Sequence, residues 1–208
     1  MLTYQISLTF FGVAIVLALS PGPDNLFVLM QSALWGRRAG LIVVFGLCTA
    51  LIAHTAAVAI GLAAVFAASA TAFTVIKLLG AAYLVYLAWS AFSAGVGASP
   101  DRAPPQQTPW QLYRRGVIMN LTNPKVSIFF LAFLPQFTSP ARGSLALQTF
   151  ALGALFMLAT LLVFGGIAFF SGVFGEKIQR SARARRWLNR AAGAIFLGLA
   201  FKLTLTQR

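Results

Sequence analysis

Acidic residues are nearly absent from this chain of 208 residues, which carries three of them against 16 lysines and arginines. Charged residues of both signs make up only 9% of the chain, whereas about 25% is usual in a soluble domain. Apolar residues make up 59%. This is the composition of a membrane protein. At about 20 residues for each helical span, the length allows roughly six spans with short loops. No room remains for a sizeable soluble domain.

The chain is equally poor in cysteine and histidine, with one of each, Cys48 and His54. A lone cysteine forms no intrachain disulfide, and a dithiol relay needs two thiols, which argues against a membrane thiol carrier. A metal path wants clustered acidic, histidine or cysteine ligands. The apolar segments offer only these two residues and Asp24, so we predict no metal site. No sequence pattern implies a bound cofactor.

The net charge of +13 lies mostly between hydrophobic segments. This distribution argues against nucleic-acid binding and follows the positive-inside rule for membrane topology. The bias predicts three cytoplasmic loops and places both termini outside. The basic residues of these loops are Arg37, Arg38, Arg102, Arg114, Arg115, Lys177, Arg180, Arg183, Arg185, Arg186 and Arg190.

Six apolar segments follow one another along the chain, each long enough to cross a bilayer as a helix. A membrane barrel would instead alternate with a period of two residues. The first segment lacks a preceding Lys or Arg and continues after its proline motif, so we predict an uncleaved span rather than a signal peptide. The predicted spans are residues 5–34, 39–66, 72–94, 112–137, 145–172 and 187–205.

A proline-rich linker, residues 98–109, divides this single transmembrane domain of residues 1–208. Three spans precede the linker, in residues 1–97, and three follow it, in residues 110–208. Two halves with an odd number of spans must have opposite orientations in the membrane. We therefore predict an all-α membrane protein built from two inverted three-helix repeats.

Two proline-broken, charged motifs lie at matching places in the two halves. The first runs Ser-Pro-Gly-Pro-Asp-Asn over residues 20–25, and the second runs Asn-Leu-Thr-Asn-Pro-Lys over residues 120–125. A helix interior normally excludes proline, and a charge within the membrane costs several kcal/mol. Interrupted spans in corresponding positions of two halves are the best sequence indication of a transporter binding site.

The residue types in these motifs predict helices that restart inside the membrane. Asparagine is a preferred N-cap, and proline is favoured at the first helical position, as in Asn123-Pro124. Ser20-Pro21 or Gly22-Pro23 can play the same part in the first motif. A restarted helix presents unpaired N–H groups and the positive end of its dipole, which suit a carboxylate. Irregular backbone at this depth is tolerated around a cavity or inside protein.

We expect Asp24 and Lys125 to reach the middle of the membrane, where together with the helix N-termini they suit a zwitterion. Asp24 is the only acidic residue within a predicted span, which makes it the candidate for proton coupling. The alternative interpretation is that the two residues form a structural ion pair and the prolines merely kink helices. The predicted substrate and coupling site comprises Ser20, Gly22, Pro23, Asp24, Asn25, Asn120, Asn123, Pro124 and Lys125.

His54 and Tyr83 are secondary candidates. A membrane histidine relays protons in some transporters, but a lone one more often bonds a neighbouring helix, and we favour the second interpretation. Tyr83 shares one face of its span with Tyr86 and Trp89 at a spacing of three residues. These aromatic residues either line a pathway or serve as lipid-facing or packing residues, and we favour the second interpretation.

The two motifs resemble those of the LysE/RhtB family of amino-acid exporters. The resemblance extends to the Phe-Phe-Leu-Ala-Phe-Leu-Pro-Gln-Phe run at 129–137, the turn at 36–40 and the stretch at 80–87, and covers nearly the whole chain. It implies proton-driven efflux, by antiport, of amino acids or related metabolites across the bacterial inner membrane. Lysine, homoserine, threonine, leucine and cysteine derivatives are substrates in the family, and the motifs do not separate them.

Two other functions stay open from the sequence. One is export of an inorganic cation, which the scarcity of ligands disfavours. The other is a membrane enzyme, although no G-x-S-x-G or H-E-x-x-H motif occurs. The predicted partners are an amino-acid substrate, protons and membrane lipids, and a chain of this size leaves a homodimer open.

Overall fold

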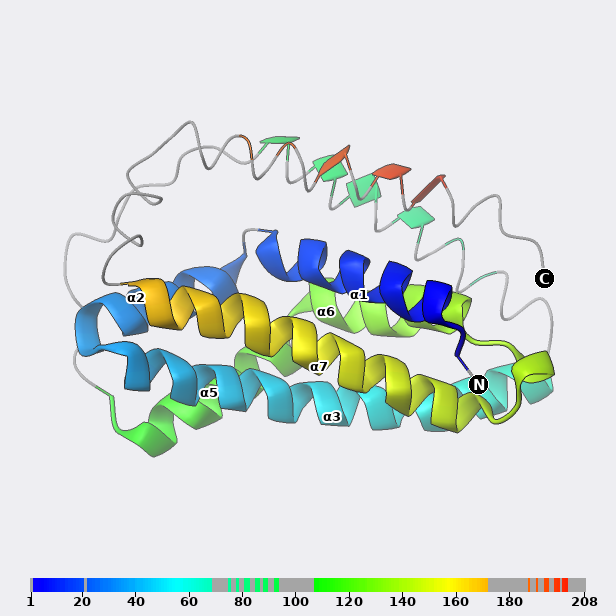
Figure 1. Ribbon diagram of the computed structural model, residues 1–208, viewed down its shortest axis with the longest axis horizontal. Helices are drawn as coiled ribbons and strands as arrows, with labels where there is room; N and C mark the ends of the chain where they lie inside the picture. The colour runs from blue at the N-terminus through cyan, green and yellow to red at the C-terminus, as the bar shows by residue number, and fades with distance from the viewer. Residues whose placement is uncertain are drawn as a thin grey trace.

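The computed structural model describes residues 2–20, 22–68 and 107–171, with scattered residues between 75 and 93 and between 187 and 201. All regular structure in these ranges is helical (Figure 1). The predicted linker up to residue 106, Tyr83 and the arginine-rich stretch 180–186 lie outside the described residues. The third and sixth predicted spans are described only in part, so the six-span count and the inverted repeat stay predictions.

Within the described ranges, two helices are long and apolar enough to cross a membrane without interruption, and both were predicted. Helix α3 (Arg37–Ala68) qualifies over Arg37–Gly61, and α7 (Leu145–Phe170) qualifies over its whole length. Gly36, with a φ of 83°, forms the turn before α3. Such a positive φ favours glycine, because it has no side chain to clash with the backbone.

The first and fourth predicted spans are each broken into two bent parts, as the proline motifs predict. Their halves meet at angles of 64° and 50°, and with these pairs the candidate spans number up to four. The first pair is α1 (Tyr4–Leu19) and α2 (Pro23–Trp35). The second pair is α5 (Pro109–Leu121) and a segment made of α6 (Pro124–Ile128), η1 (Phe129–Phe133) and η2 (Leu134–Phe137).

Helix α5 begins three residues earlier than the sequence predicted, because a capping box precedes the apolar run. Thr108 accepts a hydrogen bond from the backbone N–H of Gln111 at 3.3 Å, and the Gln111 side chain accepts one from the backbone N–H of Thr108 at 2.8 Å. Pro109 occupies the first helical position, where its missing N–H costs nothing.

The second half of the fourth span changes helix type twice before it ends. It passes from α to a π-helix and then to a 3-10 turn that contains Pro135. This winding turns three phenylalanines of the run, Phe129, Phe130 and Phe133, into the core, each less than 5% exposed. They pack with Phe10 of α1 and Phe156 of α7, so this half-span closes the bundle with aromatic contacts.

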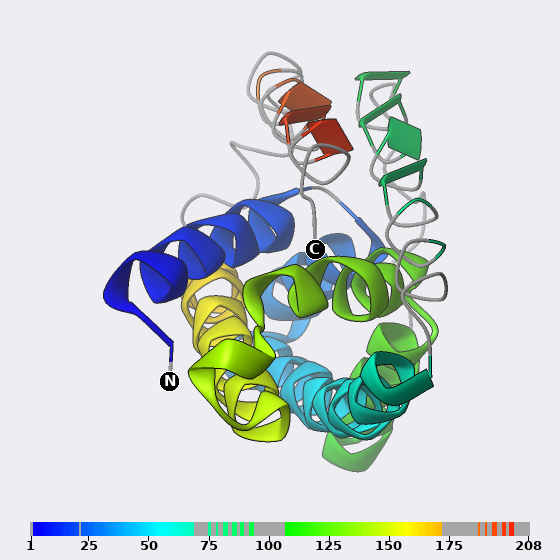
Figure 2. The ribbon, with the colours of Figure 1, turned by 90° about the vertical axis from the view of Figure 1, so that its right-hand side faces the viewer.

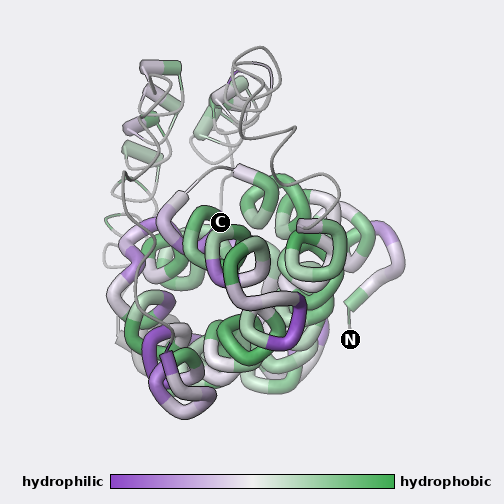
Figure 3. The backbone as a smooth tube through the Cα atoms, turned by 90° about the vertical axis from the view of Figure 1, so that its left-hand side faces the viewer, coloured by the Kyte–Doolittle hydropathy of each residue, from purple (hydrophilic) through white to green (hydrophobic). Residues whose placement is uncertain are grey.

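The described helices form one bundle. Helix α3 packs against α5 and α7, while α7 also packs against α1 and α2 (Figures 1 and 2). Large apolar side chains also cover the outside. Ile60 is 76% exposed and Leu147 is 69% exposed. Long hydrophobic stretches of helix alternate with short hydrophilic segments (Figure 3). Such an outer surface suits lipid, and the chain is a multi-pass membrane protein.

The backbones of α3 and α5 touch at two glycines. A side-chain carbon added to Gly46 would collide with the Tyr113 carbonyl oxygen, and one added to Gly116 would collide with the Val43 carbonyl oxygen. Small residues that let backbones approach are typical of helix contacts in membranes. The sequence analysis had singled out neither glycine.

Gly116→Ala is expected to destabilise the protein by about 1–3 kcal/mol, because the added carbon meets rigid backbone and forces α3 and α5 apart. Thermal unfolding in detergent measures this change. Gly12→Ala is the matched control, since a side-chain carbon at Gly12 of α1 meets nothing within 4 Å. Equal unfolding temperatures for the two variants would contradict the close contact.

A buried amide fastens the loop between the fourth span and α7. Gln148 of α7, which is 3% exposed, donates to the carbonyl oxygens of Ser139 and Gly143 at 2.9 and 3.1 Å and accepts from the Ser139 N–H at 3.1 Å. These bonds hold both ends of η3 (Pro140–Arg142). The loop is thereby fixed over the end of the bundle.

Gln148→Leu is expected to cost about 2–3 kcal/mol, because the substitution leaves three backbone groups of the loop without their partner. The measurement is the unfolding temperature, with limited proteolysis at the loop as a second readout. Gln111→Leu alters only an exposed cap and serves as the control. If the Gln148→Leu protein were as stable and as protease-resistant as this control, the hydrogen bonds of Gln148 would not stabilise the loop.

Candidate functional site

The second half of the first span begins at Gly22 and Pro23, the second of the two starts that the sequence allowed. Gly22 is the N-cap residue in extended conformation, and Pro23 is the first helical residue. No side chain caps this helix end. Asp24 follows in the first turn of α2 and is only 4% exposed. A buried carboxylate is thus held at the positive end of a helix dipole, where negative charge is stabilised.

The second half of the fourth span begins at Asn123 and Pro124, as predicted. The Asn123 side-chain oxygen accepts from the Lys125 N–H at 3.0 Å and so caps α6. Its side-chain nitrogen donates to Asp24 Oδ2 at 2.9 Å. One amide side chain therefore caps one broken helix and binds the carboxylate of the other.

Only one of the two carboxylate oxygens of Asp24 accepts hydrogen bonds from the described residues. Its Oδ2 accepts from Asn123 and, at 3.5 Å, from the side-chain amide of Asn120. Its Oδ1 is buried and has no hydrogen-bond partner in the described part of the chain. Buried carboxylate oxygens are nearly always paired, so an oxygen without a partner is an exception that requires an explanation.

Lys125 reaches across to the end of α1 rather than to Asp24. Its Nζ donates to the carbonyl oxygens of Leu17 and Ser20 at 3.1 and 3.0 Å. These carbonyls belong to the last turn of α1, where the helix dipole is negative and a cation is favoured. The structure thus shows no direct ion pair of Lys125 with Asp24, in contrast to the structural-pair interpretation of the sequence.

Asn25 joins the two parts of the first broken span. Its side-chain nitrogen donates to the Ala18 carbonyl oxygen at 2.7 Å, which satisfies another backbone group of the broken α1. Ser20, at the break itself, is 4% exposed. The structure therefore brings the two predicted motifs, one from each half of the chain, into one buried cluster.

Of the two secondary candidates, His54 and Tyr83, the structure describes only His54. His54 of α3 lies 3.3 Å from the Asn120 carbonyl oxygen and beside the Phe130 ring. This is the bond to a neighbouring helix that the favoured interpretation expects. Tyr83 lies outside the described residues. Its span neighbours Tyr86 and Trp89 are 60% and 72% exposed, as the interpretation of lipid-facing aromatics expects.

Sequence reasoning missed two features next to the cluster. One is the pair of α1 carbonyls that Lys125 binds, since backbone groups carry no residue signature. The other is Gln31 of α2, which is fully buried. Its spacing of seven residues from Asp24, on the same helix, was the signal that could have revealed it.

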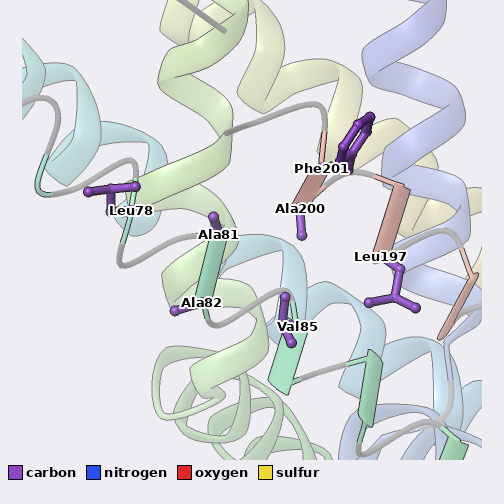
Figure 4. Close-up of a pocket in the computed structure, with 7 residues that line it drawn as sticks. All are labelled: Leu78, Ala81, Ala82, Val85, Leu197, Ala200 and Phe201. Atoms are coloured by element: carbon purple, nitrogen blue, oxygen red, sulfur yellow. The ribbon is translucent and has the colours of Figure 1, made fainter. Parts of the chain in front are cut away.

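The described ranges contain no group of three His, Cys, Asp or Glu side chains able to hold a metal ion. An apolar groove of about 400 Å³ lies between the third and sixth predicted spans (Figure 4). It offers no charged group to recognise a polar ligand, and its lining residues are Leu78, Ala81, Ala82, Val85, Leu197, Ala200 and Phe201.

Several known membrane proteins are similar to this chain over most of its length. A membrane protein of Vibrio cholerae is 34% identical over 93% of this chain and 94% of its own length. The homoserine/homoserine lactone efflux protein of Salmonella typhimurium is 31% identical over 88% of this chain and 87% of its own. A membrane protein of Bacillus subtilis is 28% identical over 96% of this chain and 98% of its own. No solved structure matches.

The family model described as "LysE type translocator" matches residues 15–207 and therefore includes both broken spans. The resemblance stated from the two proline motifs is thus confirmed over nearly the full length of the chain, and the protein belongs to the LysE type translocator family.

Proposed function

We propose that this protein exports an amino acid or an amino-acid-like metabolite from the cytoplasm in exchange for protons, with Asp24 in the binding and coupling site. One observation carries the proposal: Asp24 lies buried between two helix breaks, with one oxygen bonded to the opposite half of the chain and the other without a partner. The site is proposed to lie near the middle of the bacterial inner membrane, with both termini in the periplasm.

The amino group of the substrate binds Asp24 Oδ1 in this proposal. A charge-assisted hydrogen bond is about twice as strong as a neutral one, and a site shielded from water strengthens it further. Asn120 and Asn123 hold Oδ2, so they fix the carboxylate in one orientation and leave Oδ1 available.

The substrate carboxylate binds above Gly22. Helix α2 has no side-chain cap there, so its first N–H groups face the break. An ammonium has three hydrogens, and Lys125 uses two of them on α1 carbonyls. A side-chain carbon added to Gly22 would lie 3.4 Å from Lys125 Nζ. Glycine at this position therefore lets the ammonium lie close to the start of α2, so that both can contact one carboxylate.

Proton exchange follows from the chemistry of a single buried carboxylate. Asp24 is ionised when it holds the substrate ammonium, and it takes up a proton when the substrate leaves, because an unpaired charge at this depth is costly. Return of the empty site to the cytoplasmic side then carries one proton inward for each substrate exported. In this proposal, the two helix breaks act as hinges, about which α2 and α6 move relative to α1 and α5.

The relatives support the class of substrate. Two of them, from Salmonella typhimurium and Salmonella typhi, are homoserine/homoserine lactone efflux proteins, each 31% identical to this chain over 88% of its length. Homoserine, its lactone and the common amino acids therefore form the first panel to be tested.

The test uses inside-out membrane vesicles that contain the protein, in which export appears as uptake. Labelled members of the panel are offered with and without a proton gradient, acid inside. Gradient-dependent uptake of one class, absent from vesicles without the protein, is the expected result. No uptake across the panel by folded protein would overturn the proposal, and uptake of an inorganic cation under the same gradient would assign a different cargo.

A further inference from the structure

Helix α2 carries a second buried polar residue that the proposed site does not use. The buried positions of this helix form one stripe, which consists of Asp24, Phe27, Val28, Gln31 and Ser32. Gln31 is 0% exposed. Neither its side-chain nitrogen nor its side-chain oxygen has a hydrogen-bond partner in the described ranges. Both polar groups of this buried amide are therefore without a partner among the residues that the structure describes.

The helix itself does not explain this residue. The hydroxyl of Ser32, the next residue, is satisfied locally by the Val28 carbonyl oxygen at 2.7 Å. An unsatisfied buried amide costs about 1–3 kcal/mol, a cost that leucine or methionine in the same place would avoid. An amide retained at such a cost indicates a bound group that donates to it and accepts from it.

The position of Gln31 places that group beside the Asp24 site. Seven residues are about two turns of helix, so the two side chains share a face and their Cα atoms are about 10 Å apart along the axis. Side chains on a helix tilt toward its N-terminus, and this applies to Asp24 as well as to Gln31, so it is the greater length of the Gln31 side chain that shortens the separation. The remaining separation between amide and carboxylate suits one small molecule that contacts both.

We propose that Gln31 binds the side chain of the transported amino acid and selects for uncharged side chains that form hydrogen bonds. The inference rests on the proposed function, with the substrate amino group on Asp24. An amide both donates and accepts, which matches a hydroxyl or a carboxamide. Asp24 is the only acidic residue in the described ranges, so no second carboxylate there favours a cationic side chain.

The test compares amino acids of nearly equal shape that differ in hydrogen bonding: threonine with valine, and asparagine with leucine. The readouts are uptake into inside-out vesicles and the rise in unfolding temperature when the purified protein binds each amino acid. Gln31→Met, which keeps length and removes the amide, is expected to lower the polar-to-apolar ratio of uptake roughly tenfold. In the second readout, it is expected to shrink the difference between the rises in unfolding temperature that the polar and the apolar amino acids cause. Gln31→Leu is a second variant of similar volume.

Ser32→Ala is the matched control, because Ser32 is equally buried but bonded within its own helix. Its ratio is expected to stay that of the unchanged protein. An unchanged ratio in folded Gln31→Met, or an equal loss for all four amino acids, would overturn the inference and leave the proposed function intact. If the unchanged protein neither transports nor binds any amino acid, the proposed function and this inference both fail.

Discussion

Asp24→Asn is expected to reduce gradient-driven uptake about 100-fold while the protein stays folded. Asparagine keeps an oxygen to accept from Asn123, so the join between the two breaks survives. It carries no charge for the substrate ammonium and takes up no proton. Losing a charge-assisted hydrogen bond costs about 1.5–3 kcal/mol, which is about one to two orders of magnitude in binding before any loss of coupling.

The measurement is initial uptake into inside-out vesicles with the acid-inside gradient, at protein levels matched by immunoblot. Asp101→Asn removes an acidic residue from the predicted linker and serves as the control, with uptake expected to stay unchanged. Full gradient-dependent uptake by Asp24→Asn would show that the coupling group lies elsewhere.

Lys125→Met is expected to lower stability by about 3 kcal/mol and to abolish uptake. The ammonium holds the carbonyl oxygens of Leu17 and Ser20 at the end of α1, and methionine fills a similar volume without a donor. Carbonyl groups without partners cost several kcal/mol each inside a membrane unless water reaches them. The variant also loses the cation proposed to bind the substrate carboxylate.

Unfolding temperature and uptake are measured on the same preparations. Lys125→Arg keeps the charge and the donors, so we expect it to restore most of the stability but little of the uptake, because the larger planar head alters the space above Gly22. If Lys125→Met were as stable as the unchanged protein, the bonds to α1 would not hold the break together.

The two helix restarts could be predicted from the sequence because capping is local chemistry. Asn123 before Pro124 is an N-cap pair that requires no knowledge of the rest of the fold, and the structure shows that cap with its hydrogen bond. The uninterrupted spans followed from apolar length alone. The predicted beginnings of the second and fourth spans were off by two and three residues, because a local turn or cap sets them: Gly36 before α3 and the Thr108 capping box before α5.

The hydrogen-bond partners of the buried charges could not be predicted from the sequence. Lys125 was expected at the same depth as Asp24, and its bonds to the Leu17 and Ser20 carbonyl oxygens were not expected, because backbone acceptors at the end of a broken helix have no residue signature. The crossing at Gly46 and Gly116 depends in the same way on which faces of α3 and α5 meet.

The most direct test of the central claim, that Asp24 binds the substrate amino group, is a double-mutant cycle in equilibrium binding. The affinity of the transported amino acid is compared with that of its analogue lacking the amino group, in the unchanged protein and in Asp24→Asn. We predict that removing the amino group weakens binding at least tenfold in the unchanged protein and hardly at all in the variant, because the contact is already lost. Equal weakening in both proteins would contradict the claim and place the amino group away from Asp24.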